Sequence, residues 1–471
     1  METTKLYLTL KSLSREELRL FHHFLSCNLF NKRKEAIRLF ALLKRELNTS
    51  KPSVNKKMIY SKLYPQKSFN ATEFLNLMSY LSGPLNQFLA FQKLHAHRED
   101  ELIALCRAFR ERNLFTQFNI TLKKADTLQR HSKIHDSTFL YRNYLLEHER
   151  QHTSSQKGRA QTTNLAEAAH SLDISYFATR LRQSCYMLSH QNMSKTTYDL
   201  SIVEYILAEV KEKDLLHIPA IGIYYYCYLA QKQPNNATYF KSFQHLLITN
   251  AVLFTIVEMK DIYLLAINIA IKRYNQGHRD IVPDLLELYQ SGIDQKILLT
   301  NNILSRFTYK NVVVLALTQK QFDWAESFLN EYANLLKKDY QEVMQQYCLA
   351  KFHCEKKEFD SALSYLFLTN TSDDVYINID TKILLARIYH EQHNLDAQMA
   401  LVESFKKILN RKKEILGYHY DTYRNFLHCI NKLTTLNPYN SMDRSTLLTE
   451  IVNMQPLPDK HWFIKQLSKQ D

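Results

Sequence analysis

The feature that most constrains the fold is a short pattern that the sequence repeats three times between residues 310 and 405. Residues 321–325 read Gln-Phe-Asp-Trp-Ala, residues 358–362 read Glu-Phe-Asp-Ser-Ala, and residues 394–397 read Asn-Leu-Asp-Ala, at spacings of 37 and 36 residues. Each copy follows one apolar run of helical period and begins another. The pattern therefore predicts a series of helix–turn–helix units.

The repeated unit resembles a tetratricopeptide-type array. In such arrays an aromatic residue or Leu begins the second helix, and a small residue follows one turn later, where two helices approach closely. Only six Gly and nine Pro occur in 471 residues, which favours long helices with short connections. We predict an all-α fold, an α-solenoid of helix–turn–helix repeats with an N-terminal helical cluster.

Four regions follow from the positions of loops and caps. We predict an N-terminal helical cluster at 1–95, an irregular helical-repeat region at 96–300, tetratricopeptide-like repeats at 301–435, and a closing helix with a tail at 436–471. Ser14 and Glu17 form a predicted capping box at the start of a helix. A loop is expected at 153–158 and a helix C-cap at Gly277.

A second resemblance extends over most of the chain. It is carried by four short segments that are scattered along the sequence: residues 14–18 with Phe24 and Leu25, residues 181–185 with 190–192, residues 309–312, and residues 423–426. On these segments the chain resembles a family of uncharacterised bacterial tetratricopeptide-like proteins. The resemblance implies a helical-repeat fold and implies no catalytic residues.

Positive charge is concentrated at the N-terminal side. Residues 1–200 hold 31 Lys and Arg against 17 Asp and Glu, whereas residues 201–471 hold 30 of each. A one-sided basic field attracts polyanions or acidic protein surfaces. No long basic run exists, and the cations are expected to be dispersed among many helices. We therefore expect weak, non-specific polyanion binding, and solvated helix faces are the simpler interpretation.

One motif suggests metal chemistry. His148, Glu149 and His152 match the H-E-x-x-H pattern, which in zinc proteases places two imidazoles on one helix face beside a Glu that activates zinc-bound water. A catalytic zinc needs a third protein ligand, and the extended pattern would require Gly at Ser155 and His at Gly158. Because neither is present, we interpret the match as accidental and predict no metal and no enzyme.

The repeats also predict a binding groove. In tetratricopeptide arrays the first helix of each repeat lines a concave surface that holds peptides. The groove-facing positions predicted here are Lys310, Asn311, Tyr347, Lys351 and Arg387. A line of three cations favours an acidic peptide or a C-terminal carboxylate. Three ordinary solvated cations are the alternative interpretation.

The sequence thus favours a non-catalytic protein-interaction scaffold that binds a protein or acidic peptide on its helical-repeat surface, without a cofactor. The alternatives are a nucleic-acid- or polyanion-associated protein that uses residues 1–200 and, more remotely, a zinc metallohydrolase. Seven scattered cysteines without a CxxC pair, and no secretory or membrane-spanning segment, favour a cytoplasmic protein with reduced thiols. The sequence does not specify an oligomeric state.

Overall fold

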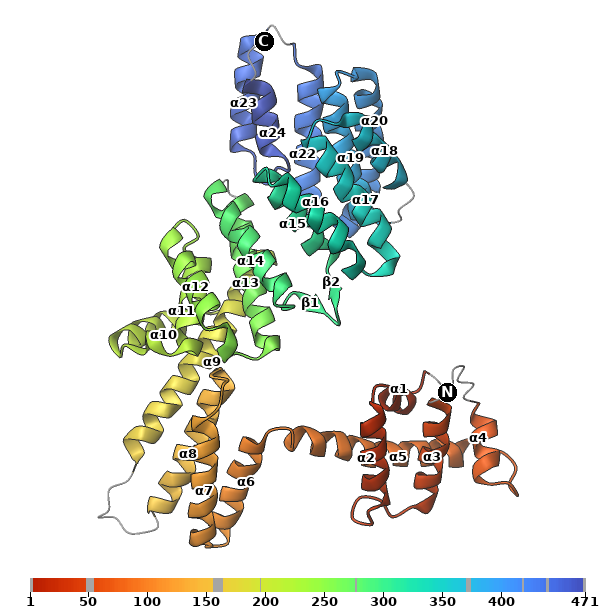
Figure 1. Ribbon diagram of the computed structural model, residues 1–471, viewed down its shortest axis with the longest axis vertical. Helices are drawn as coiled ribbons and strands as arrows, with labels where there is room; N and C mark the ends of the chain where they lie inside the picture. The colour runs from red at the N-terminus through yellow and green to blue at the C-terminus, as the bar shows by residue number, and fades with distance from the viewer. Residues whose placement is uncertain are drawn as a thin grey trace. The chain divides into compact units, whose positions relative to one another are not determined.

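The computed structural model describes residues 3–47, 55–155, 164–194, 196–275, 278–369, 374–416, 419–437 and 440–468. Across these residues the structure is helical apart from one two-stranded hairpin, so the all-α prediction is confirmed (Figure 1). None of the described helices has the length and apolar character needed to cross a membrane. The loop predicted at 153–158 and the cap predicted at Gly277 lie wholly or partly outside the described residues.

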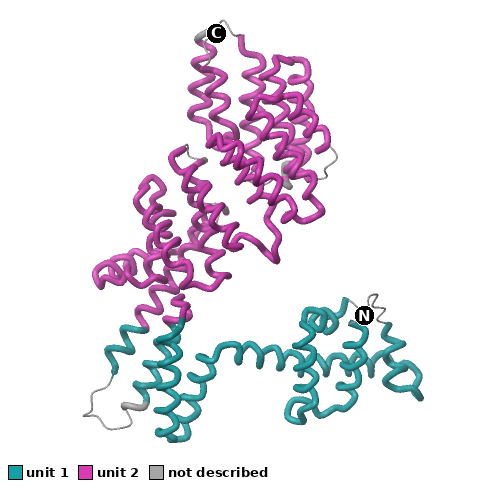
Figure 2. Tube along the Cα trace, in the orientation of Figure 1, with its two compact units in different colours: residues 1–132, 141–171 teal, residues 133–140, 172–471 magenta. Residues whose placement is uncertain are grey.

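The chain divides into two compact units (Figure 2). The first contains residues 1–132 and 141–171, and the second contains residues 133–140 and 172–471. Two long helices contribute residues to both units, namely α8 (Ser137–Ser155) and α9 (Leu165–Met193).

The first unit begins with five helices that share a hydrophobic core of their own, in which Phe21, Phe40 and Phe74 are fully buried. They are α1 (Lys5–Lys11), α2 (Arg15–Ser26), α3 (Lys34–Leu47), α4 (Lys56–Leu63) and α5 (Ala71–Leu94). The predicted capping box is present at the start of α2. The Ser14 backbone N–H donates to the Glu17 carboxylate at 2.7 Å, and the Glu17 N–H donates to the Ser14 hydroxyl at 3.1 Å.

Two further helices of the first unit, α6 (Arg98–Glu111) and α7 (Phe115–Arg130), pack with the adjoining part of α8 around Cys106, Phe118 and Leu146. Ion pairs also join these helices. Arg142 of α8 binds Asp100 of α6 through two hydrogen bonds of 2.7 and 2.8 Å. Such a bidentate pair fixes the relative orientation of two helices better than a single contact does.

The second unit continues from α9 into five helices, whose large hydrophobic core extends through the following helices as far as Ile388. They are α10 (Ser201–Glu212), α11 (Pro219–Lys232), α12 (Ala237–Thr249), α13 (Ile256–Asn275) and α14 (Val282–Asp294). Short 3₁₀ turns interrupt the connections at η1 (Leu215–His217), η2 (Ala251–Leu253) and η3 (Arg279–Ile281). Inside this core the Tyr224 hydroxyl donates to Glu258 at 2.7 Å, so the buried carboxylate is not left without a partner.

A small hairpin follows α14 and differs from the expectation of no sheet. Strands β1 (Leu299–Thr300) and β2 (Ile303–Leu304) pair in antiparallel fashion. The two residues between them, Asn301 and Asn302, have φ values of 52° and 61°. Asn tolerates this left-handed conformation, which a two-residue hairpin turn of type I′ requires.

Three helix pairs then correspond to the repeated sequence pattern. They are α15 (Arg306–Thr318) with α16 (Phe322–Glu331), α17 (Lys338–Glu355) with α18 (Phe359–Thr369), and α19 (Val375–Glu391) with α20 (Leu395–Arg411). Phe322, Phe359 and Leu395 are the first residues of the three second helices, as the pattern predicts. A further 3₁₀ turn, η4 (Ala333–Leu335), lies between the first two pairs.

The small-residue position of the pattern is buried in all three pairs. Ala325 and Ala362 are fully buried three residues into α16 and α18. In the third pair the equivalent position is the buried Gln398, and Ala397, which the sequence pattern suggested, is only half-buried. The Gln398 side chain donates to the Ala386 carbonyl of the facing helix, so a polar residue is accommodated at this crossing.

The turn inside each pair has the same backbone conformation. Its central residue lies in the left-handed region, with φ of 57° at Lys320, 64° at Lys357 and 56° at His393. The next residue donates its N–H to a carbonyl five residues earlier, at 2.9–3.0 Å, in the bonds Gln321 to Ala316, Glu358 to His353 and Asn394 to Tyr389. This bonding is that of a Schellman motif, which ends a helix by satisfying its last carbonyls. The turn between α6 and α7 repeats it, with Asn113 at φ 58° and the Leu114 N–H bonded to Phe109.

The chain ends in α21 (Lys413–Leu416), α22 (His419–Thr435), α23 (Ser441–Asn453) and α24 (Lys460–Ser468). These helices form a core with α19 and α20 that contains Phe405, Phe426 and Phe463. One closing helix was expected within residues 436–471, but the structure has two, α23 and α24. Pro456 and Pro458 separate them, and the helix resumes at Lys460.

We predict that Lys357→Gly stabilises the protein. A non-Gly residue in the left-handed region lowers the free energy of unfolding by roughly 1–2 kcal/mol, because its Cβ is too close to the following carbonyl oxygen. Gly has no Cβ and avoids this strain, although it loses more conformational entropy on folding. The expected net gain is about 1 kcal/mol in the free energy of unfolding, measured by urea denaturation.

The neighbouring residue is the matched control. Lys356 has φ of −78° in the right-handed helical region, so Lys356→Gly should destabilise by up to about 1 kcal/mol. Equal effects of the two substitutions would contradict the assigned turn.

Candidate functional site

The predicted groove residues lie on the first helices of the three pairs. Lys310 and Asn311 belong to α15, Tyr347 and Lys351 to α17, and Arg387 to α19. Tyr347 is buried, and Asn311 donates a hydrogen bond of 3.1 Å to the Tyr289 hydroxyl of α14. Tyr347 and Asn311 are thus engaged within the fold, and the remaining predicted groove residues are the cations Lys310, Lys351 and Arg387.

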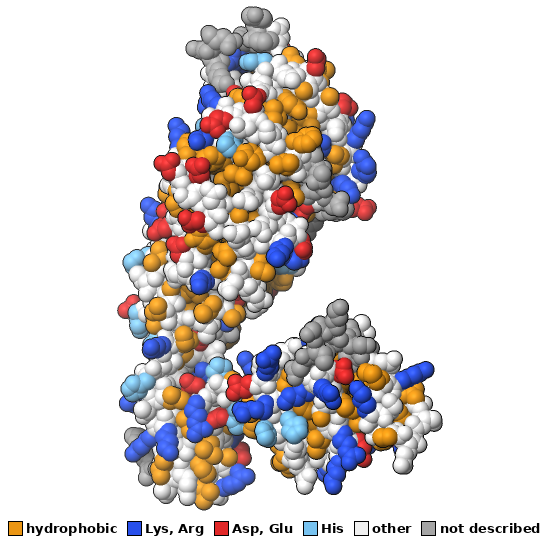
Figure 3. Space-filling model, turned by 45° about the vertical axis from the view of Figure 1, so that its right-hand side comes forward, with side chains coloured by type: hydrophobic (Ala, Val, Ile, Leu, Met, Phe, Trp, Pro, Cys, Tyr) orange, Lys and Arg blue, Asp and Glu red, His pale blue; other side chains and the backbone are white. Residues whose placement is uncertain are grey.

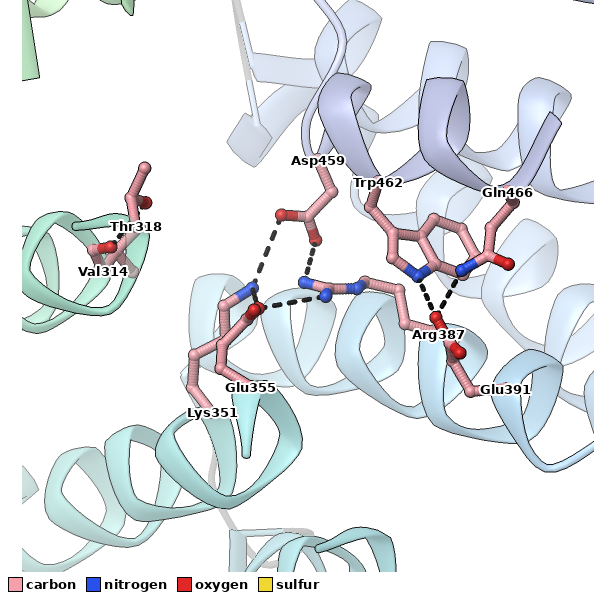
Figure 4. Close-up of polar contacts among 9 residues, drawn as sticks. All are labelled: Val314, Thr318, Lys351, Glu355, Arg387, Glu391, Asp459, Trp462 and Gln466. Carbon is pink, nitrogen blue, oxygen red and sulfur yellow. Dashed lines mark hydrogen bonds and ion pairs between the residues drawn. The ribbon is translucent and has the colours of Figure 1, made fainter. Parts of the chain in front are cut away.

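Lys351 and Arg387 converge on two carboxylates (Figure 4). The Arg387 guanidinium donates to Asp459 at 3.1 Å and to Glu355 at 3.0 Å. The Lys351 ammonium lies 3.4 Å from Asp459 and 3.8 Å from Glu355. Two cations from successive first helices thus share two carboxylates, and we name these four residues the charged cluster.

Asp459 comes from the connection directly before α24, 72 residues beyond Arg387. The helix that follows is attached to α19 by further polar contacts (Figure 4). The Trp462 indole N–H donates to Glu391 at 2.8 Å, and Gln466 donates to the same carboxylate. The Arg387 guanidinium also lies 5.5 Å from the centre of the Trp462 ring, within range of a cation–π contact.

In the charged cluster, burial and the neighbouring cations shift the pKa of Asp459 in opposite directions. Arg387 is only 6% exposed, and the Asp459 side chain is 24% exposed. Burial alone would raise the pKa of Asp459, but Arg387 and Lys351 outweigh it and hold this pKa well below the usual value of 3.8. Asp459 is therefore ionised at neutral pH, and the cluster is an internal ion network.

Lys310 belongs to a separate pair. Its ammonium lies 2.5 Å from Asp380 of α19, and this contact raises the pKa of Lys310 although burial opposes the shift. The predicted line of three cations is thus divided between two sets of internal carboxylates. Sequence reasoning did not identify Asp459 or Glu355 as partners. Only the spacing of Lys351 and Glu355, one helical turn apart, gave a local signal.

The H-E-x-x-H residues lie on α8. The His148 and His152 rings are 4.5 Å apart, and burial is the main cause that lowers the pKa of His148. Glu149 is 1% exposed and accepts hydrogen bonds from Arg110 at 2.7 Å and Arg107 at 3.2 Å. Burial would raise the pKa of Glu149, but the two arginines outweigh it and lower this pKa. Its carboxylate therefore joins α8 to α6.

No group of three or more His, Cys, Asp or Glu residues suited to a metal ion occurs in the part of the chain that the structure describes. Six of the seven free cysteines are buried. Burial raises the pKa of Cys106 to about 11 and that of Cys348 to about 12. Since the thiolate is the nucleophilic form, these two thiols are poor nucleophiles at neutral pH. No protein-family model and no curated protein sequence matches the chain.

We predict that Asp459→Asn destabilises the attachment of α24 by about 2 kcal/mol at pH 7, because the buried Arg387 then keeps only Glu355 as its remaining carboxylate partner. The chain has two tryptophans, Trp324 and Trp462. In a Trp324→Phe background, urea denaturation followed by fluorescence therefore reports on Trp462 alone.

The pH dependence of this effect has a defined sign. The folded pKa of Asp459 is depressed, so its contribution is present above the unfolded pKa near 3.8 and is lost as the pH falls through the lower folded value. The difference between wild type and Asp459→Asn should therefore shrink below about pH 4. Asp421→Asn is the control, because Asp421 is 60% exposed in an (i, i+3) pair and should change stability by less than about 1 kcal/mol.

For the α8 motif, we expect Glu149→Gln to lower the melting temperature, since Arg107 and Arg110 lose their shared carboxylate. We also expect elemental analysis of the purified wild-type protein to find no stoichiometric zinc. About one zinc per chain that disappears in His148→Ala would overturn this interpretation of the motif.

Proposed function

We propose that the chain is a non-catalytic, tetratricopeptide-like α-solenoid that binds an acidic segment of a protein partner along the first helices of its repeats. One observation carries the proposal. Lys351 of α17 and Arg387 of α19 together hold Asp459, a carboxylate from a distant part of the chain. Cations presented by successive helices suit the recognition of acidic peptides.

The repeat assignment is supported by the backbone. The three helix pairs share one turn conformation, and each second helix begins with Phe or Leu. The first helices α15, α17 and α19 pack in succession, and so do the pairs themselves. Contacts between nearest neighbours are the basis of solenoid architecture.

The absence of catalysis is supported by how the reactive groups are used. Glu149, the residue that would act as a base in a zinc site, is held by two arginines. Arg182 and Tyr224 likewise hold the buried Glu258 within the second unit. Each of these carboxylates contributes to helix packing.

In this proposal the C-terminal segment is an internal ligand. Asp459 supplies the carboxylate, and Trp462 supplies the apolar anchor that contacts Arg387 and Glu391. An acidic partner segment would replace this internal ligand on Lys351 and Arg387. Competition between the two segments would then set the affinity for the partner.

The test uses a fluorescently labelled peptide with the sequence of residues 456–468. In the full-length chain, Asp459→Ala combined with Trp462→Ala should loosen α24 and leave both cations without Asp459. We expect fluorescence anisotropy to show peptide binding to this double variant at least tenfold tighter than to wild type.

Two controls identify the contact. A peptide with Ala in place of the aspartate should bind at least tenfold more weakly, and adding Arg387→Ala to the double variant should abolish binding. Equal affinity for the Asp-containing and the Ala-substituted peptides would exclude carboxylate recognition by the charged cluster.

A further inference from the structure

The N-terminal helices carry more positive than negative charge. Residues 1–95 contain sixteen Lys and Arg against six Asp and Glu, a net charge of +10 within the chain total of +14. Figure 3 shows Lys and Arg side chains gathered over this part of the surface, with fewer Asp and Glu among them.

Helix α3 carries three of these cations on one face. Lys34, Arg38 and Arg45 are all exposed. At 100° per residue they fall within an arc of roughly 40°, and at 1.5 Å per residue they span about 16 Å along the axis. The exposed Ala41 lies between them on the same face. We name Lys34, Arg38 and Arg45 the basic face of α3.

The loop before α3 holds two more cations in a fixed conformation. Its buried Asn31 donates from its side-chain amide to the Leu25 carbonyl at 2.8 Å and to the Arg33 carbonyl at 3.1 Å. The Lys32 backbone N–H donates to the Tyr80 hydroxyl of α5 at 3.0 Å. The Arg33 guanidinium lies 4.5 Å from the centre of the Tyr80 ring. The loop is therefore ordered before any partner arrives, which reduces the entropic cost of binding.

Folding stability does not explain the basic face. Lys34 lies in the first turn of α3, where a cation opposes the helix dipole, and of the three cations only Arg45 lies in the last turn, where a cation is favourable. Elsewhere in this helical cluster Lys62 pairs with Glu46 and Lys67 pairs with Glu73. None of Lys34, Arg38 and Arg45 has an ion-pair partner among the residues that the structure describes. Lys34 and Arg38 therefore gain stability neither from the helix dipole nor from an ion pair among the described residues, which leaves them available to an anionic partner.

The composition of the face indicates the kind of partner. None of the large apolar side chains that the described structure exposes lies on α3. The centres of protein–protein interfaces are depleted in charged residues and enriched in aromatic ones. Interfaces with nucleic acid are more polar and much more positive. A face of Lys and Arg around a single Ala fits the second type of interface.

We propose that the basic face of α3, with Lys32 and Arg33 of the preceding loop, binds the phosphate backbone of nucleic acid. The cations neutralise successive phosphates and release condensed counterions, so affinity falls steeply with salt. Such contacts depend on the charge and the spacing of the phosphates and do not discriminate between base sequences. This site is separate from the charged cluster, so it does not depend on the proposed peptide-binding function.

The test compares two charge-matched triple variants of the full-length chain. The first carries Lys34→Gln, Arg38→Gln and Arg45→Gln. The control carries Lys406→Gln, Lys407→Gln and Arg411→Gln, which remove three exposed cations from α20. Both sets lower the net charge by three, and Gln is a good helix former in both. Fluorescence anisotropy measures binding to a labelled 20-base-pair DNA duplex and to the RNA duplex of the same sequence, over a series of salt concentrations.

We expect the α3 variant to bind at least tenfold more weakly at 100 mM salt. Its slope of log affinity against log salt should be shallower by about 2–3, since each phosphate contact contributes about 0.9. The control should keep both the affinity and the slope within error. Equal losses in the two variants, or none in either, would overturn the proposal. Tighter binding of one duplex would identify it as the preferred form.

Two further measurements separate binding from folding and from general anion attraction. Circular dichroism should show unchanged helicity and a nearly unchanged melting temperature, because Lys34 opposes the helix dipole whereas Arg45 complements it. The double variant Arg38→Lys, Arg45→Lys keeps the charge and should still bind the duplex. If this variant loses duplex binding while its helicity is intact, recognition of the phosphate backbone through charge is contradicted. Polyglutamate is then added as a competitor at a charge concentration equal to that of the duplex. Displacement of the duplex by polyglutamate would favour an acidic protein partner and would also overturn the proposal.

Discussion

The packing of the C-terminal helices depends on one half-buried carboxylate. Asp459 lies between the cations of two successive repeats and brings α24 onto α19, where Trp462 and Glu391 complete the attachment. Removing charges from water is costly unless each finds a partner, so Arg387 and Lys351 would destabilise the repeats if nothing faced them. The same residue thus pairs with both cations and leads into α24, which contributes Phe463 to the core.

The helix pairs that present these cations share one turn conformation. A non-Gly residue in the left-handed region ends each first helix, and an apolar residue begins each second helix. The equivalent turn at Asn113, far from the recognisable sequence repeats, indicates that the device extends beyond them. The left-handed conformation at each turn costs roughly 1–2 kcal/mol, and it lets the second helix fold back so that Ala325, Ala362 and Gln398 are buried against the first helices. The first helices α17 and α19 pack together, and Lys351 and Arg387 on them come within reach of Asp459.

Much of the helical structure could be predicted from local signals. Apolar periodicity, the Ser14–Glu17 capping box and the aromatic starts at Phe322 and Phe359 are encoded within a few residues each. The partners of the predicted cations could not be found in this way. Asp459 is 108 residues from Lys351 and Asp380 is 70 residues from Lys310, and no local pattern specifies such pairs. Gln398 was missed because a polar residue replaces the small one at a helix crossing, and the Asn301–Asn302 hairpin because its turn lacks Gly.

The two proposed surfaces differ in how their cations are held. Those of the charged cluster already face carboxylates of the chain, whereas the basic face of α3 is exposed and without an ion-pair partner among the described residues. The central claim is that Asp459 and Arg387 interact strongly enough to attach α24. A double-mutant cycle with Asp459→Ala, Arg387→Ala and the double variant measures this coupling free energy from urea denaturation. A favourable coupling above about 1 kcal/mol is predicted, and a coupling of zero within error would contradict the account.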